Sequence, residues 1–482
     1  MKKNITQLDM ISKESKYNVF LCIDLPDFLN DVPEILRSFT PMINISKNDK
    51  LNHFSLKYLL DKNNNALFQI RFLEDVLDYP LPDLYNFLSP SLGEKSEIKK
   101  YVKEKLYQYC VTLTGNELPY GSLTGVRPTR IIYAKNGSVS NIKQFLIDNY
   151  YVSSDRARLI EEVIINQAGY YAPDPYSVDL FVNIPICKTK CSYCSFGTIC
   201  LSKIQGFVDR YVECVCKEIS YKLKFLDSTK KVKNIYIGGG TPSCIPLPQL
   251  EKILSKFSNL SKEEFTVEAG RPDSINLELI KMMRENGVTR ISINPQTFSE
   301  KTLREIGRSH SISDIYEAFE LAKEYSFLIN MDLIAGLPGE DIDTFINSLE
   351  KTISLKPDNI TIHSLSIKKG SNLMNNGYIK NVDGVTKKMV DCSIIMLENS
   401  GYLPYYLYRQ KNMLDNLENV GYCLPQKQCS YNIDYMEETN SVIGFGAGAM
   451  TKYIYFDQNR IERICNKKDI RLYCADMQIL DC

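Results

Sequence analysis

Residues 178–196 read VDLFVNIPICKTKCSYCSF, and the interpretation of the whole chain depends on this stretch. Cys187, Cys191 and Cys194 form a C-x3-C-x2-C triplet directly after an apolar run, Val178 to Pro185, that is typical of a buried strand. Thiolates this close in sequence can bind neighbouring irons of a cubane iron–sulfur cluster, which cysteines normally hold. No further cysteine follows at a matching spacing. One iron would therefore keep an open position, as in metal sites that react.

Three other interpretations of the triplet stay open at this point. A structural zinc site uses four ligands, usually in paired C-x2-C units. A disulfide needs an oxidising compartment, and free cysteines also pack in cores as small apolar residues. The spacing favours the cluster over these.

The composition limits the class of protein. At 482 residues the chain exceeds one typical core, so about two or three domains are expected. Lys and Arg number 58, as do Asp and Glu, which does not indicate a nucleic-acid-binding protein. No apolar run is long enough for a membrane span, and the start MKKN leads into no hydrophobic segment. We expect a cytoplasmic protein whose 15 cysteines are ligands or buried thiols, and its 3 histidines disfavour a histidine-based metal site.

The pattern along the chain predicts three parts: an N-terminal α+β domain over 1–170, a core over 171–375 and a C-terminal substrate-covering region over 376–482. In the first part, the apolar runs 54–60 and 66–72 flank DKNNN, which predicts a β-hairpin. The segment near Val32–Phe39 is amphipathic. Helices are predicted at Glu94–Thr112, Asn141–Asn149 and Ser154–Gln167, and at Thr386–Glu398 in the last part.

In the core, apolar strands alternate with helical stretches, which predicts a parallel α/β sheet. The predicted strands are Val178–Pro185, Asn234–Gly239, Phe265–Ala269, Arg290–Pro295, Leu328–Ala335 and Asn359–Leu365. The predicted helices are Gly206–Leu226, Pro248–Phe257, Ile275–Glu285, Ile312–Tyr325 and Asp341–Leu355.

The triplet, with Tyr193 before its last cysteine, resembles the signature of the radical S-adenosylmethionine (SAM) enzymes. More narrowly, IPICKTKCSYCSF resembles the oxygen-independent coproporphyrinogen III dehydrogenase (oxidase) family, in its HemZ-type branch. The resemblance implies that Cys187, Cys191 and Cys194 hold a 4Fe–4S cluster whose open iron is chelated by SAM. It also implies a partial (β/α)6 radical SAM barrel, with ligands at the C-terminal strand ends. The predicted fold class is thus α/β, with an N-terminal α+β domain and a C-terminal mixed extension.

Further candidate residues follow the predicted strands. GGGTP at 238–242 ends the second strand, and its glycines let the backbone approach the ammonium or carboxylate of an amino acid. Glu268 ends the third strand, and a carboxylate suits the hydroxyls of a ribose. Singly, such residues are more often turns, caps or surface groups, but their spacing resembles the SAM site of the family. The predicted cofactor-binding residues are Phe181, Tyr193, Gly238, Gly239, Gly240, Thr241, Glu268, Gln296, Arg308 and Asp332.

Other segments are candidates for substrate contact. YGSLTGVRPTR at 120–130 is either a solvated linker turn or an anion clamp, because Arg binds carboxylates bidentately. The tyrosine-rich stretch 402–413 is either an aromatic core segment or a face for a flat tetrapyrrole. In the second case Arg409 and Lys411 would pair with propionates. Over the whole chain, the predicted substrate-binding residues are Arg271 and Arg409. GFGAGA at 444–449 lacks the βαβ context of a dinucleotide fingerprint and resembles the segment that closes the SAM site of the family.

The chain departs from the family pattern at Phe181 and Asn183, where the family has Tyr and His; groups that handle protons are thereby lost. The resemblance implies anaerobic oxidative decarboxylation of coproporphyrinogen III propionates to vinyl groups by a 5′-deoxyadenosyl radical, in heme biosynthesis. The implied partner is a flavodoxin- or ferredoxin-type electron donor. Two alternatives remain. One is a heme-binding or heme-delivery protein with His53, His310 or His363 as axial ligand, and the other is a radical SAM enzyme that methylates heme or opens its ring.

Overall fold

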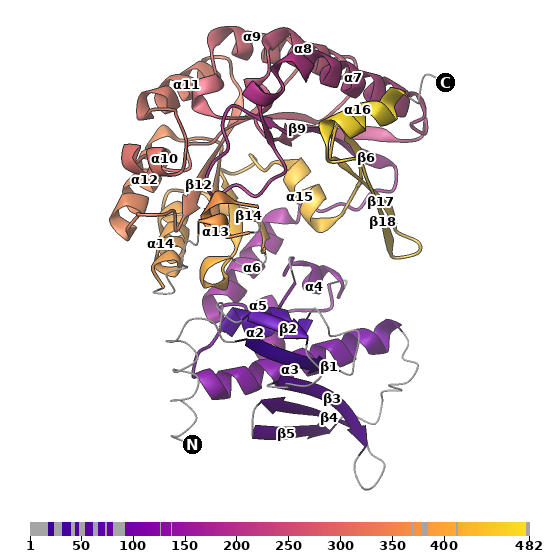
Figure 1. The fold of residues 1–482 in the computed structure, drawn as a ribbon, viewed down its shortest axis with the longest axis vertical. Coiled ribbons are helices and arrows are strands. Elements are labelled where there is room, and N and C mark those ends of the chain that lie inside the picture. Colours follow the sequence, from indigo (N-terminus) through magenta and orange to yellow (C-terminus); the bar gives the residue numbers. More distant parts are fainter. Residues whose placement is uncertain are drawn as a thin grey trace. The chain divides into compact units, whose positions relative to one another are not determined.

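The computed structural model describes residues 18–23, 31–39, 44–47, 54–60, 66–72, 75–80, 92–125, 127–135, 137–368, 370–376, 384–410 and 413–478. The chain divides into two compact units (Figure 1). The smaller unit comprises 1–128 and 132–161, and the larger comprises 129–131 and 162–482. The predicted turn at 61–65, His53 and Lys411 lie outside the described residues.

The smaller unit contains a five-stranded sheet of order β2-β1-β3-β4-β5. Its strands are β1 (Asn18–Ile23), β2 (Asn44–Lys47), β3 (Phe54–Leu60), β4 (Ala66–Phe72) and β5 (Asp75–Pro80). Strands β3 and β4 are antiparallel with Leu60 opposite Ala66, which confirms the predicted hairpin. The amphipathic segment forms α2 (Asp31–Phe39), and the predicted helices form as α3 (Leu92–Thr114), α5 (Ile142–Tyr150) and α6 (Ser154–Gln167). On α3 the residues Ile98, Val102 and Leu106 are buried, because a four-residue spacing places them on one face.

The larger unit is built on an eleven-stranded sheet. Its central strands β6, β9, β10, β11, β12 and β13 are neighbours in this order and run parallel, which confirms the six predicted strands. Their bounds are β6 (Ser177–Ile184), β9 (Lys231–Gly239), β10 (Glu264–Gly270), β11 (Arg290–Ile293), β12 (Leu328–Ala335) and β13 (Asn359–Ser364). All four residues of β11 are buried, as expected for a parallel strand covered on both faces.

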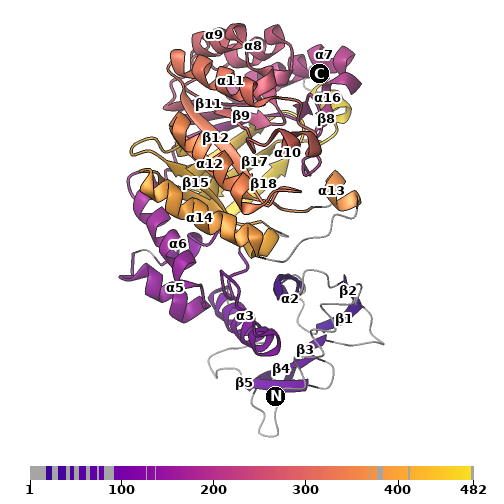
Figure 2. The ribbon, with the colours of Figure 1, turned by 90° about the vertical axis from the view of Figure 1, so that its left-hand side faces the viewer.

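Helices connect the parallel strands and cover the outer face of the curved sheet, as Figures 1 and 2 show. They are α7 (Val208–Lys224), α8 (Leu247–Ser255), α9 (Leu277–Glu285), α10 (Glu300–Glu305), α11 (Ile312–Glu324) and α12 (Ile342–Leu355). The helix α8 buries Leu250, Ile253 and Leu254, an apolar stripe of the kind that packs on a sheet. This alternation confirms the predicted partial barrel. In the described parts of the chain, no helix combines the length and the apolar character that crossing a bilayer requires.

The C-terminal region adds strands to both ends of the parallel sheet. At one end β15 (Asn419–Cys423) pairs antiparallel with β13, and β14 (Leu403–Tyr408) pairs with β15. At the other end β16 (Ser441–Phe445) runs parallel to β6, followed by the hairpin of β17 (Met450–Tyr455) and β18 (Arg460–Cys465). The predicted helix Thr386–Glu398 forms as α14 (Val385–Asn399). The C-terminal region therefore extends the parallel sheet at both of its ends.

A buried polar network fills the N-terminal edge of the parallel sheet. Arg290, 2% exposed, forms an ion pair with Glu264 at 2.9 Å and also bonds to Asn359. Asn234 bonds through its amide group to Asp179 and to Asp434, both at 2.9 Å. Arg290 and Glu264 satisfy each other internally, whereas Asp179 Oδ2 is buried without a hydrogen-bond partner among the described residues. We assign this edge to stability. Further buried polar groups without partners lie at the opposite edge, described below.

Candidate functional site

The cysteine triplet lies on a loop at the C-terminal edge of the parallel sheet. The loop leaves β6, and the short strand β7 (Ile186–Cys187) pairs with β8 (Ile199–Cys200) to close it. Ser192 is fixed on both sides: its N–H donates to Ile306 O at 3.0 Å, and its carbonyl accepts from Leu373 N at 2.9 Å. These two hydrogen bonds thus hold the loop in a defined shape between Ile306 and Leu373.

The three thiols are free and half-buried. Thr241 Oγ1 donates to Cys187 Sγ at 3.7 Å, and the backbone N–H of Phe196 donates to Cys194. Burial raises the pKa of Cys187 and of Cys194, so thiolates at these positions need positive charge beside them, as iron provides. Hydrogen bonds to the sulfurs are also among the groups that tune such clusters.

The interpretations of the triplet differ in the geometry that they require. Within the described residues, no group of three or more His, Cys, Asp or Glu side chains is gathered as for one metal ion. A zinc ion needs its ligands around one point, whereas the thiolates of a cubane bind different irons and stay apart. The described cysteines also form no disulfide. The spacing of the triplet in the sequence remains the reason to favour a cluster.

The glycine turn at 238–240 packs directly against the strand that leads to the first cysteine. A Cβ on Gly239, whose φ is +108°, would lie 1.9 Å from Asn183 Oδ1. A Cβ on Gly240 would lie 2.4 Å from the carbonyl oxygen of Ile186. Only glycine fits at these two positions, and the turn brings its backbone groups next to the loop of the cysteines.

Glu268 lies beside this turn, near the end of β10. Its Oε1 accepts a hydrogen bond from the Tyr236 phenol at 2.6 Å, and its Oε2 accepts from Gly239 N at 3.2 Å. Burial raises the pKa of Glu268, the bond from Tyr236 opposes this, and the nearby charge of Asp332 adds to the rise. The carboxylate is therefore held in one orientation at the strand end.

Gln296 carries a strained backbone and an unused acceptor. Its φ is +68°, which is uncommon outside glycine. Its main chain bridges to β12, because its N–H donates to Asp332 O and its carbonyl accepts from Ile334 N. The side-chain oxygen Oε1 is buried and has no hydrogen-bond partner among the described residues. Strain together with a buried unpartnered acceptor is typical of a ligand-binding position.

Arg308 joins the strand ends to the cysteine loop. Its guanidinium donates to Asn294 O at 2.6 Å and lies beside Cys191 and Tyr193. Burial raises the pKa of Tyr193, whose ring packs partly buried against the apolar cluster that contains Leu337. The Nε of Arg308 is buried without a partner among the described residues. Arg308 therefore offers a positive charge at the position where the loop meets β10 and β11.

Asp332 pairs with a histidine that the sequence did not place in the SAM site. Its Oδ2 lies 3.6 Å from His363 Nε2 on β13, and its Oδ1 accepts from Asn330 at 2.8 Å. Burial alone would raise the pKa of Asp332, but the hydrogen bond and charge of His363 outweigh it, and the pKa is lowered. The carboxylate is thus ionised, with a 25% exposed imidazole beside it.

The departures from the family pattern have structural consequences. Phe181 packs against aromatic rings, with its ring centroid 6.3 Å from Tyr236 and 6.5 Å from Tyr431. Asn183 donates from Nδ2 to Ala447 O at 2.5 Å. The glycine-rich segment 444–449 is thereby fastened to the end of β6, beside Gly239. That this segment closes a SAM site stays a prediction.

The predicted substrate arginines differ in their surroundings. Arg271 is 2% exposed and bonds to Asp273, Thr189 and Ser309, so its guanidinium fixes the cysteine loop. Arg409 follows β14 and donates to Asn416 O at 3.3 Å. The geometry thus favours a positioning role for Arg271, and the assignment of both residues to substrate stays a prediction.

The cationic loop 120–130 ends in contacts to protein carboxylates. Thr129 Oγ1 donates to Glu437 at 2.8 Å, and Arg130 pairs with Glu438. Both glutamates come from the end of α15 (Ser430–Glu437) or directly after it. Arg130 therefore binds an anion of the chain itself. Within the tyrosine-rich stretch 402–413, Leu403–Tyr408 forms β14, in which Tyr405 and Tyr406 are buried as core residues.

An aromatic cluster on the concave side was not predicted. Tyr236 stacks on Tyr431 of α15 with 4.5 Å between ring centroids, and Tyr431 stacks on Tyr435 at 5.8 Å. The position of Tyr236 could have been predicted from the sequence, because Asn234, Tyr236 and Gly238 alternate along β9 and so share one face of the strand. The tyrosines of α15 had none, since the pattern predicted no helix there.

Comparisons with known proteins identify the family of the chain. The profile of the radical SAM superfamily matches residues 183–352. The chain is 36% identical over 406 residues to the oxygen-independent coproporphyrinogen-III oxidase-like protein HemZ of Bacillus subtilis, covering 80% of this chain and 81% of that protein. It is 31% identical over 284 residues to the heme chaperone HemW of Lactococcus lactis, covering 56% and 68%.

Among solved structures, the coproporphyrinogen III oxidase HemN of Escherichia coli matches with a TM-score of 0.52 at 20% identity, over 65% of this chain and 72% of that chain. This likeness supports the barrel fold. The members of this superfamily bind a 4Fe–4S cluster and SAM, in agreement with the donor set of the loop. The chain belongs to the radical SAM superfamily, in the group of HemZ-type coproporphyrinogen oxidase-like proteins.

Proposed function

We propose that the protein catalyses the anaerobic oxidative decarboxylation of coproporphyrinogen III propionates to vinyl groups. The observation that carries the proposal is the link between the cysteine loop and the polar groups of four successive strand ends. The main-chain bonds of Gln296 to Asp332 and Ile334, and the bond of Glu268 to Gly239, hold these groups together. The choice of substrate is supported by the name of the HemZ relative.

Each residue of the site has a task in this proposal. Cys187, Cys191 and Cys194 would hold the cluster. The turn 238–240 would receive the amino group of SAM, and Glu268 the hydroxyls of its ribose. Gln296, Arg308 and Asp332 would complete the SAM contacts. When bound, the cluster and SAM supply a 5′-deoxyadenosyl radical, while the chain orients the reactants and excludes water.

The chemistry is compatible with the loss of proton-handling groups at Phe181 and Asn183. A propionate that becomes a vinyl group gives up one hydrogen atom to the radical, carbon dioxide, and one further electron to a one-electron acceptor that the reaction requires, and it takes up no proton. The groups required of the chain are therefore an apolar face and cations. Phe181, Tyr236 and Tyr431 supply aromatic surface.

Cations for the propionates lie at the C-terminal ends of β13 and β14. Lys368 follows β13 and donates to Gln410 at 2.6 Å, and Arg409 follows β14. Burial lowers the pKa of Lys368, so a carboxylate arriving next to it would favour its charged form. We propose that the C-terminal region, with Arg409, covers the substrate.

The test is anaerobic incubation of the reconstituted protein with SAM, a reductant and coproporphyrinogen III, followed by mass spectrometry. We expect products that have lost carbon dioxide and two hydrogens at each converted propionate, together with 5′-deoxyadenosine. Cys191→Ala is the matched control and should yield neither. Cleavage of SAM with unchanged coproporphyrinogen would refute the substrate and leave the radical SAM chemistry intact.

One observation favours a second candidate function, heme binding. Histidines that ligate a metal commonly direct their other ring nitrogen to a carboxylate, as His363 does towards Asp332. His310 is 2% exposed, so of these two histidines only His363 is accessible to a heme. A heme titration followed by the Soret band tests this. Spectral changes lost in His363→Ala and kept in His310→Asn, with no decarboxylation by wild type, would replace the first proposal.

A further inference from the structure

Tyr408, the last residue of β14, carries a phenol that the fold leaves unused. Its half-buried side chain packs, as Phe181 and Tyr236 do, against the buried cluster that contains Tyr406 and Tyr431. The ring stacks on Tyr406 with 6.3 Å between centroids and 9° between the ring planes. Among the described residues, none forms a hydrogen bond with the Tyr408 phenol oxygen. A phenol both donates and accepts, so this group is available to a ligand.

The strand pairing shows where this phenol lies. Tyr408 is the register partner of Asn419 on β15, and Asn419 Oδ1 accepts from the N–H of Ser364, the last residue of β13, at 3.0 Å. Tyr406 lies over Gly421, where a Cβ would be 1.8 Å from the Tyr406 ring, so glycine is required for β14 to lay its tyrosines on the sheet. The Tyr408 phenol is therefore at the C-terminal edge of the sheet, level with the end of β13.

Two carboxylates from other strands lie near this phenol. Burial raises the pKa of Tyr408, and the charges of Asp332 on β12 and Glu268 on β10 add to the rise. The phenol is therefore a neutral hydrogen-bond donor at neutral pH. The cations Arg409 and Lys368, by contrast, follow directly after β14 and β13. A neutral donor beside carboxylates and a pair of cations thus occur at the same edge of the sheet.

The two kinds of group suit different propionates. A propionate that becomes a vinyl group loses a hydrogen atom to the radical and one electron to a one-electron acceptor of the oxidised flavin class. The bond to its carboxylate carbon then breaks, the electron pair of that bond becomes the new C=C bond, and carbon dioxide leaves without charge. A cation bound to this carboxylate would stabilise the starting state more than the transition state, because the negative charge disappears. A neutral donor beside other carboxylates holds the group in place without this penalty.

We propose that Tyr408 binds the carboxylate of the reacting propionate through its phenol O–H, while Arg409 and Lys368 bind propionates that do not react. The inference rests on the proposed function, since it takes coproporphyrinogen as the substrate. Tyr408 would then be a catalytic residue, and the cations would supply affinity.

The experiment compares phenol variants by kcat, KM and the coupling ratio, which is the amount of carbon dioxide released per 5′-deoxyadenosine formed. Tyr408→Phe keeps the ring that stacks on Tyr406 and removes only the O–H. The matched control is Tyr405→Phe, a buried tyrosine of the same strand whose phenol already accepts from Asn432 Nδ2 at 3.2 Å.

We expect Tyr408→Phe to lower kcat about tenfold while KM changes less than about twofold, because the cations keep most of the binding. The coupling ratio should fall as well, since SAM is cleaved while the propionate is held less firmly. Tyr405→Phe should match wild type in all three quantities. The loss in kcat should be constant between about pH 6.5 and pH 9, because the phenol stays neutral. The other titratable groups at this position, Asp332, Glu268, His363 and Tyr406, are the same in both proteins.

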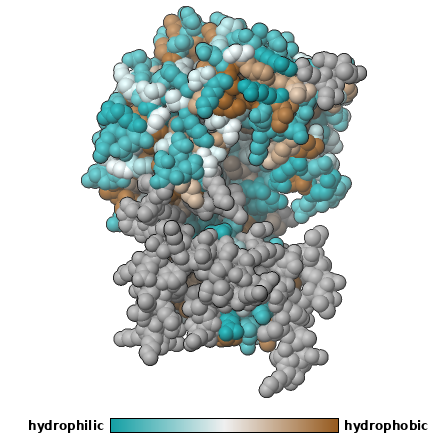
Figure 3. Space-filling model, in the orientation of Figure 1, coloured by the Kyte–Doolittle hydropathy of each residue, from teal (hydrophilic) through white to brown (hydrophobic). Residues whose placement is uncertain are grey.

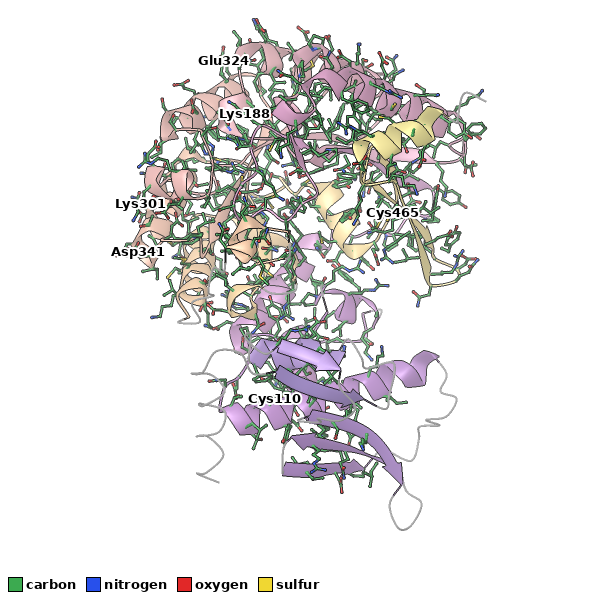
Figure 4. All side chains as sticks on the ribbon, viewed as in Figure 1. Cys110, Lys188, Lys301, Glu324, Asp341 and Cys465 are labelled. Carbon is green, nitrogen blue, oxygen red and sulfur yellow. The ribbon has the colours of Figure 1, made fainter. Side chains whose placement is uncertain are left out.

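The cations are tested in parallel. Arg409→Ala and Lys368→Ala should raise KM and leave the coupling ratio unchanged. Their control is Lys301→Ala, an exposed lysine of the outer helix α10. Figure 3 shows mainly hydrophilic atoms over α10 and α12, and Figure 4 labels Lys301 and Asp341 there. Lys301→Ala should therefore behave as wild type.

Four results would overturn the inference. Unchanged kcat and coupling in Tyr408→Phe would show that the phenol does not touch the reacting carboxylate, with the proposed function still standing. A raised KM with unchanged coupling would place a non-reacting propionate at Tyr408. Equal losses in Tyr405→Phe would mean a general disturbance of β14. If wild type cleaves SAM and leaves coproporphyrinogen intact, the proposed function fails and the inference fails with it.

Discussion

The phenol of Tyr236 donates a 2.6 Å hydrogen bond to Glu268 Oε1 across the neighbouring strands β9 and β10. The bond fixes the carboxylate proposed to bind ribose and partly opposes the rise in its pKa that burial causes. Tyr236 also stacks on Tyr431, so one side chain connects the proposed SAM site with the aromatic cluster. Several expectations depend on this connection.

Tyr236→Phe should make SAM binding more sensitive to acid. Without the phenol the pKa of Glu268 rises further, so its carboxylate is protonated at a higher pH. SAM affinity should therefore fall as pH decreases, and the midpoint of this fall should lie at higher pH in the variant than in wild type. Calorimetric titrations between about pH 5.5 and pH 8 measure it. Superimposable profiles would contradict a ribose contact through ionised Glu268.

Glu268→Ala should weaken SAM binding by about 1–3 kcal/mol, because the hydroxyls of the ribose lose their acceptor. The measurement requires protein with an intact cluster, verified by iron content and absorbance. The matched control is Glu305→Ala, an exposed carboxylate at the end of α10. Equal affinities of Glu268→Ala and wild type would remove Glu268 from the SAM site.

The cysteine triplet should be sufficient for the cluster. Cys187→Ala, Cys191→Ala and Cys194→Ala should each lose it, while reconstituted wild type holds about four irons. The structure supplies sharp controls, because Cys200 is the register partner of Cys187 and Cys244 Sγ lies 3.5 Å from Ile186 O. Cys200→Ser and Cys244→Ala should keep full iron content. Loss of iron in either would mean a fourth protein ligand and no open iron for SAM.

Arg409 and Arg271 should respond differently to substitution. Arg409→Ala should raise KM for coproporphyrinogen about tenfold with little change in SAM binding. Arg271→Ala should instead lower iron content, because Arg271 bonds to Thr189 in the cysteine loop at 2.6 Å. Iron analysis and steady-state kinetics on both variants separate the roles. If Arg271→Ala kept its full iron content and had a raised KM for coproporphyrinogen, Arg271 would be a substrate-binding residue.

The network at the N-terminal edge should matter for stability alone. Glu264→Ala leaves the buried Arg290 without its partner at 2.9 Å, which should cost about 3–5 kcal/mol of the free energy of unfolding. Glu462→Ala is the control, since Glu462 pairs with Arg460 at 3.1 Å but both side chains are nearly half exposed. That change should cost less than about 1 kcal/mol. Urea unfolding of the two variants compares them, and equal midpoints would show that the buried pair contributes no more than the exposed one.

Local sequence determined the elements of the barrel and predicts the cluster ligands. The six parallel strands and their helices follow from apolar runs alternating with amphipathic segments, a pattern that a short window contains. The cysteine triplet could be identified because its ligands come from one loop of 8 residues, 187–194. Glycines 239 and 240 were recognisable because only glycine tolerates such close backbone contacts.

Tertiary structure alone decided what depends on partners distant in sequence. His363 lies 31 positions after Asp332, and only the pairing of β12 with β13 brings them together. The sequence gives the charge of Arg271, from which a substrate contact is predicted, but only the structure shows the Asp273, Thr189 and Ser309 that surround it. The aromatic stack of Tyr236 on Tyr431 joins residues 195 positions apart, through a helix that carries no apolar period of its own. Charge and side-chain type are local properties, whereas burial and pairing arise from the packing of the whole sheet.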